Sequence, residues 1–113
     1  MNRGDVVLVD WPFSDRMGSK LRPAIVIQAD FLNGLIDDTV LVQITSKAHH
    51  IPGTEVQLDP RTETASGLLH VCFEFCPNLL TIDESLIEQV IGVLSAATMN
   101  RIDDCVKATL GLP

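Results

Sequence analysis

Residues 21–29 read Leu-Arg-Pro-Ala-Ile-Val-Ile-Gln-Ala, and this stretch decides the fold. From residue 23 to residue 29 the side chains are almost continuously apolar, which is typical of a strand covered on both faces. A proline at the first position of a strand costs no hydrogen bond of the ladder. Because the residue before a proline is pushed towards extended backbone, we expect Arg22 to be fixed where a polar loop, residues 12–21, enters this buried strand.

Further strands are expected on both sides of this one. Apolar runs and period-two patterns predict strands over residues 6–11, 39–46, 54–58, 68–76 and 89–94. In the strand over 39–46, alternation puts Val40, Val42 and Ile44 on one face and Leu41, Gln43 and Thr45 on the other. We expect Pro77 and Asn78 to end the strand over 68–76.

Two helical segments are predicted near the C-terminus. Asp83 is suited to cap a single turn over residues 84–86, and Ser95 is suited to cap a helix over residues 96–110. Helical spacing places four side chains of the longer helix on the core: Met99, Ile102, Val106 and Leu110. Gly111 suits the end of this helix.

The order of elements, short strands followed by one helix, favours a mainly β fold rather than a strand–helix alternation. We predict a small barrel with the C-terminal helix packed on it. With 113 residues, the chain is expected to form a single domain over residues 1–113. The hydrophobic fraction of 46% excludes a disordered chain.

The cysteines do not indicate a disulfide framework or a metal site. Their number, three, is odd, and Cys72 and Cys76 would lie about 13 Å apart along a strand, too far to share a metal or a disulfide. No phosphate-binding glycine loop or zinc-site spacing is present, so we expect no cofactor and no metal.

The N-terminal residues do not resemble a signal peptide and no apolar run approaches the ~18 residues of a membrane span, which predicts a cytoplasmic protein.

The net charge of −7 argues against non-specific binding to a polyanion. The charge is uneven, however: residues 1–50 carry five basic and six acidic side chains, and residues 51–113 carry three basic and nine acidic ones. A local phosphate site in the first half is therefore compatible with the composition.

Arg22 is the first candidate for such a site. A guanidinium held at the head of a strand can bind a phosphate with two hydrogen bonds and stays charged, and Ser19 and Lys20 just before it offer a hydroxyl and a second cation. Thr45 ends the strand over 39–46 and could hold a phosphate oxygen beside Arg22 if the register of the two strands is suitable. From spacing alone, a rim arginine in a structural ion pair and an ordinary strand threonine remain open alternatives.

The pair His49-His50 is the only adjacent pair of histidines. Either imidazole could act as a general acid or base near neutral pH. The alternative is an exposed loop pair without a role.

Six motifs in the same order together resemble one known family: Arg3-Gly4-Asp5-Val6-Val7, residues 18–27 around Arg22-Pro23, Gln43-Ile44-Thr45-Ser46, Ser66-Gly67-Leu68, Leu80-Thr81-Ile82-Asp83 and Ile91-Gly92-Val93-Leu94-Ser95. The chain resembles the MazF/PemK toxins of bacterial toxin–antitoxin pairs over nearly its whole length. The resemblance implies an SH3-like barrel that forms a homodimer. It also implies a cognate antitoxin, whose disordered acidic tail occupies the RNA groove.

The resemblance implies a metal-independent endoribonuclease that cleaves single-stranded RNA. In this family the ribose 2′-hydroxyl attacks the adjacent phosphate and leaves a 2′,3′-cyclic phosphate and a 5′-hydroxyl, which would explain a preference for RNA over DNA. Arg22 and Thr45 match the catalytic arginine and threonine. Ser19, Lys20, Gln43 and Ser46 are expected to contact RNA, and the loop before Arg22 matches the loop that closes over it.

The chain departs from the family before Thr81. Where many members carry a basic and an acidic residue, alignment places Phe75 and Pro77, with Glu74 and Cys76 beside them. The groups that move protons are therefore not identified by the resemblance. Together with the acidic charge, this departure leaves an alternative open: a non-catalytic module of the same fold that binds an antitoxin or a protein target, as the gyrase-poisoning CcdB relatives do.

Overall fold

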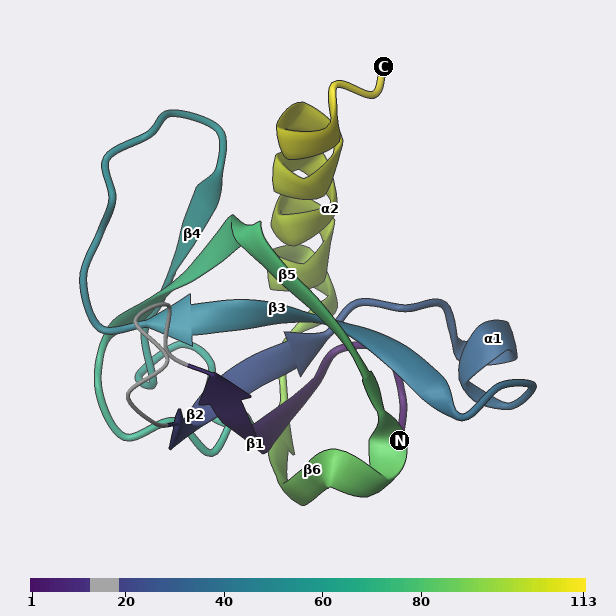
Figure 1. Cartoon of the computed structure of the whole chain (residues 1–113). Helices are drawn as coiled ribbons and strands as arrows, with labels where there is room; N and C mark the ends of the chain where they lie inside the picture. Colours follow the sequence, from purple (N-terminus) through teal and green to yellow (C-terminus); the bar gives the residue numbers. More distant parts are fainter. Residues whose placement is uncertain (13–18) are drawn as a thin grey trace.

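The computed structural model describes residues 1–12 and 19–113, and for Pro12, Ser19 and Lys20 it describes the main chain only. Its elements, shown in Figure 1, are β1 (Asp5–Pro12), β2 (Ser19–Val26), α1 (Asp30–Asn33), β3 (Asp38–Thr45), β4 (Glu55–Leu58), β5 (Cys72–Asp83), the 3-10 turn η1 (Glu84–Leu86), β6 (Ile87–Val93) and α2 (Ala96–Leu110).

The strands form one antiparallel sheet in the order β4-β5-β3-β2-β1-β6. Helix α2 packs against β4 and β5 at one end of this order, while α1 lies apart beside β3 (Figure 1). The predicted mainly β fold with a C-terminal helix is confirmed. Within the described residues β4 and β6 are unpaired with each other, so the sheet is open rather than a closed barrel.

Two hydrophobic clusters cover the two faces of the sheet, as the apolar stretch of β2 predicts. Ile25 and Val42, cross-strand partners, belong to the cluster beneath α2, together with Met99 and Ile102. Val26 and its partner Leu41 belong to the second cluster on the other face. The predicted alternation is confirmed for Leu41, which faces one cluster, and for Val42 and Ile44, which face the other.

Both ends of β2 differ from those expected. Strand β2 begins at Ser19, so residues 19–21 are not loop, because Lys20 and Leu21 pair with Trp11 and Asp10 of β1. The same strand ends at Val26.

Strand β5 starts only at Cys72 and continues through Pro77 to Asp83, which contradicts the predicted break at Pro77. The reason is a bulge. Val42 pairs with Leu79, whereas the next residue, Gln43, pairs with Phe75. Residues 76–78 of β5 therefore have no partner in β3 and form a bulge. Because Pro77 lies in this bulge, its missing N–H costs no hydrogen bond between β3 and β5.

Helix α2 follows its local signals closely. The Ser95 hydroxyl accepts the N–H of Thr98, and Gly111 adopts the left-handed conformation, with φ of 70°, that ends the helix. Glu63 from the loop after β4 accepts both the N–H and the hydroxyl of Ser95, each at 2.9 Å. The prediction that Leu110 faces the core is wrong: it is 53% exposed, and Cys105 is buried instead.

The loop between β4 and β5 packs directly on β6 at two glycines. A Cβ on Gly92 would lie 2.3 Å from the carbonyl oxygen of Ala65, and a Cβ on Gly67 would lie 2.2 Å from that of Ile91. The Val93 N–H donates to the Ala65 carbonyl at 2.9 Å. The motifs Ser66-Gly67-Leu68 and Ile91-Gly92-Val93 are thus explained by this close approach of two backbones.

Candidate functional site

Arg22 and Thr45 are brought together by the register of β2 and β3. Ala24 pairs with Gln43, and continuing this antiparallel register by two residues puts Arg22 opposite Thr45. Arg22 is half-buried and pairs on its other side with Val9 of β1. Since neighbouring strand residues alternate between faces, Arg22, Gln43 and Thr45 lie on one face of the sheet.

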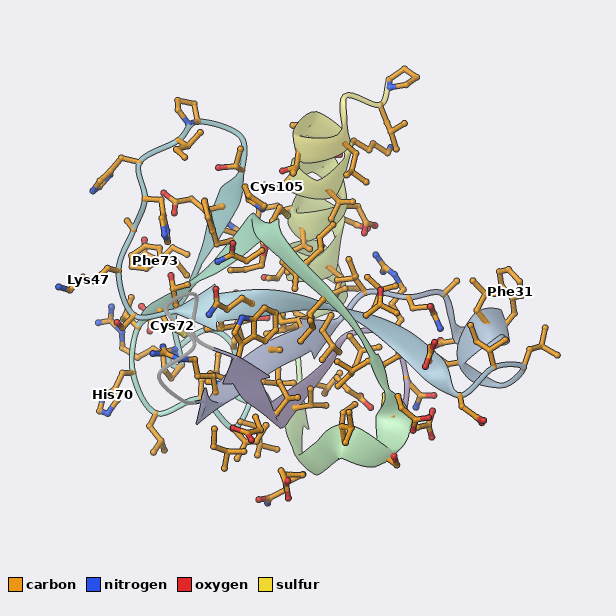
Figure 2. All side chains as sticks on the ribbon, in the orientation of Figure 1. Phe31, Lys47, His70, Cys72, Phe73 and Cys105 are labelled. Carbon is orange, nitrogen blue, oxygen red and sulfur yellow. The ribbon has the colours of Figure 1, made fainter. Side chains whose placement is uncertain are left out.

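A cavity of about 580 Å³ opens at this end of the sheet. Arg22, Thr45 and Ser46 contribute to its lining, and so do His70 and Val71 from the loop before β5. Most of the remaining wall is apolar. Ile44, Leu68 and Ile91 of this wall belong to the cluster beneath α2, so the cavity lies at the end of the sheet and reaches the face opposite Gln43. In Figure 2, His70 and Lys47 project at this end of the molecule and Phe31 projects at the opposite end. Three of the six predicted site residues therefore meet at one cavity.

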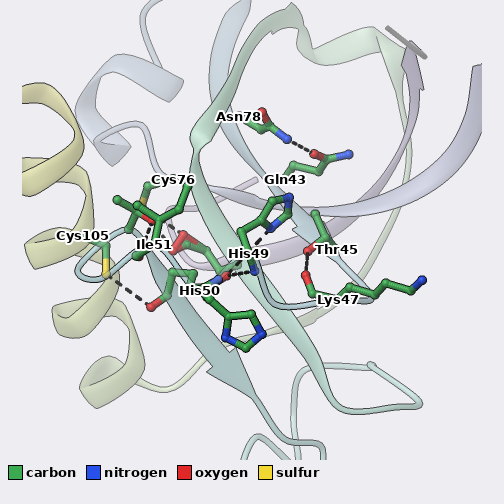
Figure 3. Close-up of polar contacts among 12 residues, drawn as sticks. Gln43, Thr45, Lys47, His49, His50, Ile51, Cys76, Asn78 and Cys105 are labelled. Atoms are coloured by element: carbon green, nitrogen blue, oxygen red, sulfur yellow. Dashed lines mark hydrogen bonds and ion pairs between the residues drawn. The ribbon is translucent and has the colours of Figure 1, made fainter. Parts of the chain in front are cut away.

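The Thr45 side chain is half-buried and already has a hydrogen-bond partner. Its hydroxyl donates to the main-chain carbonyl of Lys47 at 2.9 Å (Figure 3). A hydroxyl has one proton. Thr45 must therefore give up this bond before it can donate to a phosphate oxygen.

The other predicted contact residues are placed differently. Gln43 is only 9% exposed, and its side-chain oxygen accepts a hydrogen bond from the amide of Asn78 (Figure 3). Ser46 is exposed. The side chains of Ser19 and Lys20 lie outside the described residues, as does the expected loop over residues 13–18.

His49 is the residue that sequence reasoning left undecided and that the structure brings to this face. Its imidazole stacks on Phe75, with ring centroids 3.7 Å apart and an interplanar angle of 6°. Phe75 is the cross-strand partner of Gln43 on one side and of Glu55 on the other. Glu55 accepts the main-chain N–H groups of His49 and His50, a contact across the loop between β3 and β4 that no local sequence pattern predicts.

On the opposite face, Glu74 is fully buried beside Cys76. The Cys76 thiol donates to the carboxylate oxygens at 3.0 and 3.2 Å. Burial raises the pKa of Glu74 to about 7 and also raises the pKa of both Cys76 and Cys105. Because only the thiolate is a good nucleophile, the raised pKa values indicate that these two buried cysteines are unreactive.

Among residues 1–12 and 19–113, no group of three or more His, Cys, Asp or Glu side chains is arranged to hold a metal ion. No helix of this described part is both long enough and apolar enough to cross a membrane.

A family model described as PemK-like, MazF-like toxins of type II toxin–antitoxin systems matches residues 2–110. The chain belongs to this family. The MazF-like toxin fold is also found in solved structures. An endoribonuclease from a mycobacterial species, in complex with its cognate antitoxin, is 25% identical, with 100% of this chain and 97% of that chain covered and a TM-score of 0.82.

Two more structures support the MazF-like fold. A mycobacterial endoribonuclease is 24% identical over 100% of this chain and 93% of its own, with a TM-score of 0.79. A MazE–MazF crystal structure from Deinococcus radiodurans is 21% identical over 100% of this chain and 98% of the other, with a TM-score of 0.76.

The family motifs of this MazF-like toxin are of two kinds: some hold the fold together, and others line the cavity. Arg3-Gly4-Asp5 is structural: Arg3 pairs with Asp103 of α2 and donates to the Ile27 carbonyl at 3.1 Å, which ties the N-terminus to the helix. The motifs around Arg22-Pro23 and Thr45-Ser46 instead meet at the cavity. The second kind carries the candidate chemistry.

Proposed function

We propose that this MazF-like toxin is a metal-independent endoribonuclease that cleaves single-stranded RNA by attack of the ribose 2′-hydroxyl. The observation that carries the proposal is that Arg22 and Thr45, the two residues matching the family's catalytic pair, line one cavity in a chain that belongs to the family. The antitoxin-bound endoribonuclease with the same fold supports the same reaction class.

Arg22 has the chemistry to bind the scissile phosphate. A guanidinium forms two parallel hydrogen bonds with a phosphate and remains charged at any physiological pH. As the 2′-oxygen attacks, negative charge grows on the non-bridging oxygens, and Arg22 stabilises it and can donate a proton to the leaving 5′-oxygen. Thr45 holds a non-bridging oxygen once its hydroxyl turns away from the Lys47 carbonyl.

Three partners belong to this proposal: single-stranded RNA, a cognate antitoxin and a second copy of the chain. With a net charge of −7, the protein should bind RNA through local contacts near Arg22 rather than through a general positive field. Ser19, Lys20, Gln43 and Ser46 are proposed as RNA contacts. Sedimentation equilibrium should give twice the chain mass of 12.3 kDa if the homodimer forms.

The function is tested by incubating the purified protein with a mixed-sequence single-stranded RNA, with and without EDTA. We expect cuts in both samples, with 2′,3′-cyclic phosphate and 5′-hydroxyl ends. The absence of cuts at any protein-to-RNA ratio, or cuts that EDTA abolishes, would overturn the proposal.

Arg22→Ala should abolish cleavage while the melting temperature stays close to that of the wild type, since Arg22 is at a rim. Arg101→Ala is the matched control, because it removes the same charge from the exposed surface of α2, where the Arg101 guanidinium donates a hydrogen bond to Thr98 of the same helix. Growth arrest on expression that survives Arg22→Ala would favour the non-catalytic alternative.

A further inference from the structure

The loop that joins β3 and β4 folds back over the sheet face that carries Thr45. Through this loop the His49 ring comes to lie on Phe75, and Phe75 is the cross-strand partner of Gln43, two residues before Thr45. Figure 3 draws the side chains of His49, Gln43 and Thr45 in the same region of the close-up. An imidazole is thereby brought to a face where the aligned family positions, Phe75 and Pro77, offer no group that can transfer a proton.

Glu55 holds the loop in this position. Its two carboxylate oxygens accept the main-chain N–H groups of His49 and His50, each at 2.8 Å. The hydrogen bond from the His49 N–H is the largest cause of the lowered pKa of Glu55, so the carboxylate is charged at neutral pH. His50 has a φ of 59°, the only positive value at a non-glycine residue in the described chain. Such a backbone costs free energy and persists where surrounding contacts enforce it, often at functional sites.

The same carboxylate also lies near the imidazole. His49 Nδ1 lies 3.9 Å from Glu55 Oε2, so the edge that carries Nδ1 faces the carboxylate. Stacking on Phe75 fixes the ring plane, and the side chain remains 39% exposed. At 3.9 Å the two atoms are not hydrogen-bonded, but the attraction between the charged carboxylate and an Nδ1–H favours the tautomer in which Nε2 is free to accept a proton.

We propose that His49, positioned by Glu55 and Phe75, is the general base that accepts the 2′-hydroxyl proton during RNA cleavage. The inference rests on the proposed function. In the step, the proton of the 2′-hydroxyl passes to His49 Nε2, the bond from the 2′-oxygen to phosphorus forms, and the bond from phosphorus to the 5′-oxygen breaks. The 5′-oxygen takes up one proton, and His49 returns its proton to solvent before the next turnover.

The charged or titratable groups on the segments next to His49 are the following. Glu55 comes from β4, His50 and Lys47 belong to the same loop, and Arg22 of β2 lies on the same sheet face. Glu74 of β5 points to the opposite face, next to Cys76. Burial raises the pKa of Glu74 to about 7, and the Glu74→Gln variant separates its effect on folding from the pH dependence of cleavage.

The test is the pH dependence of kcat for a defined RNA substrate in the wild type, His49→Gln and His50→Asn. We expect kcat of the wild type to fall at acidic pH and His49→Gln to lose this limb together with roughly 10²- to 10⁴-fold in rate. His50→Asn is the matched control, because asparagine tolerates positive φ, and it should retain the wild-type rate. In His49→Gly, added imidazole should restore cleavage, which a purely structural role would not allow.

Glu55 acts through His49 and is tested as a positioning residue. Glu55→Gln should lower kcat with little change in KM, and it should lower it no further in the His49→Gln background. Circular dichroism of each variant at each pH separates loss of activity from loss of fold.

The inference would be overturned if His49→Gln kept full activity and the wild-type pH profile, or if imidazole did not restore cleavage in His49→Gly. The proposed function would still stand in either case, provided that cleavage depends on Arg22. A wild-type protein that cuts no RNA would overturn both.

Discussion

The Cys76 thiol and the Glu74 carboxylate form a buried hydrogen-bonded pair, with Sγ 3.0 and 3.2 Å from the two carboxylate oxygens. Both side chains have no exposed surface, and they lie in the cluster beneath α2, where the Cys76 sulfur also approaches the Ile102 carbonyl at 3.9 Å. A carboxyl group in such a place is favoured in its neutral form, because burial disfavours charge.

This pair predicts a pH-dependent stability. Burial raises the pKa of Glu74 from 4.5 to about 7, so the folded protein favours the protonated acid. The resulting stabilisation is fully present below pH 4.5 and is lost as the pH rises through about 7. Urea denaturation should show the free energy of unfolding falling by on the order of 1–3 kcal/mol between pH 5 and pH 8.

Glu74→Gln should remove most of this slope, because the amide is neutral at every pH. Glu88→Gln, an exposed change on β6, is the control and should leave the slope unchanged. If Glu74→Gln unfolded with the wild-type pH dependence, the assignment of the slope to Glu74 would be wrong.

Thr45→Val should lower cleavage roughly 10²-fold, since it removes one donor to the developing charge on phosphate. The fold should persist because valine is favoured in strands. Thr45→Ser keeps the hydroxyl and should retain most activity, and Thr81→Val on an exposed part of β5 is the control. Rates are compared on one defined RNA, and equal rates for Thr45→Val and wild type would contradict a role for the hydroxyl.

Gly92→Ala should destabilise the protein by about 1–3 kcal/mol or more, because the added Cβ meets main-chain atoms of residues 65 and 66 at 2.3 Å and the loop must move. Since that loop carries His70 and Val71 to the cavity, cleavage should fall as well. Gly34→Ala is the matched control, with its nearest neighbour atoms 3.9 Å away. Thermal melts of the two variants give the comparison, and equal melting temperatures would argue against the close contact.

Ser95→Ala should cost about 1 kcal/mol, the usual contribution of an N-cap hydroxyl. The loss also deprives Glu63 of one of its two donors from Ser95. Ser95→Thr retains the hydroxyl and should melt close to the wild type. A Ser95→Ala protein as stable as the wild type would mean that the cap contributes nothing measurable.

The sequence by itself determined the features that depend on local interactions. The bounds of α2 follow from Ser95, the helical spacing of its apolar side chains and Gly111, all within a few residues of the bonds that they make. The strand character of β2 and β3, and the faces to which Val42 and Gln43 belong, follow from period two. Local chemistry also singled out Arg22 and Thr45, and the resemblance to the family then gave them the roles of catalytic arginine and threonine.

Only the tertiary structure decided what depends on pairing between distant segments. The pairing of Ala24 with Gln43 brings Arg22 and Thr45 to the same end of the sheet and to one cavity. The bulge in β5 lets the strand continue past Pro77. The stacking of His49 on Phe75 joins a loop to a strand 26 positions later in the chain, and Glu55 fixes it from a third segment. Side-chain periodicity constrains a strand's faces but not its partner or register, so these relationships exist only once the sheet has formed.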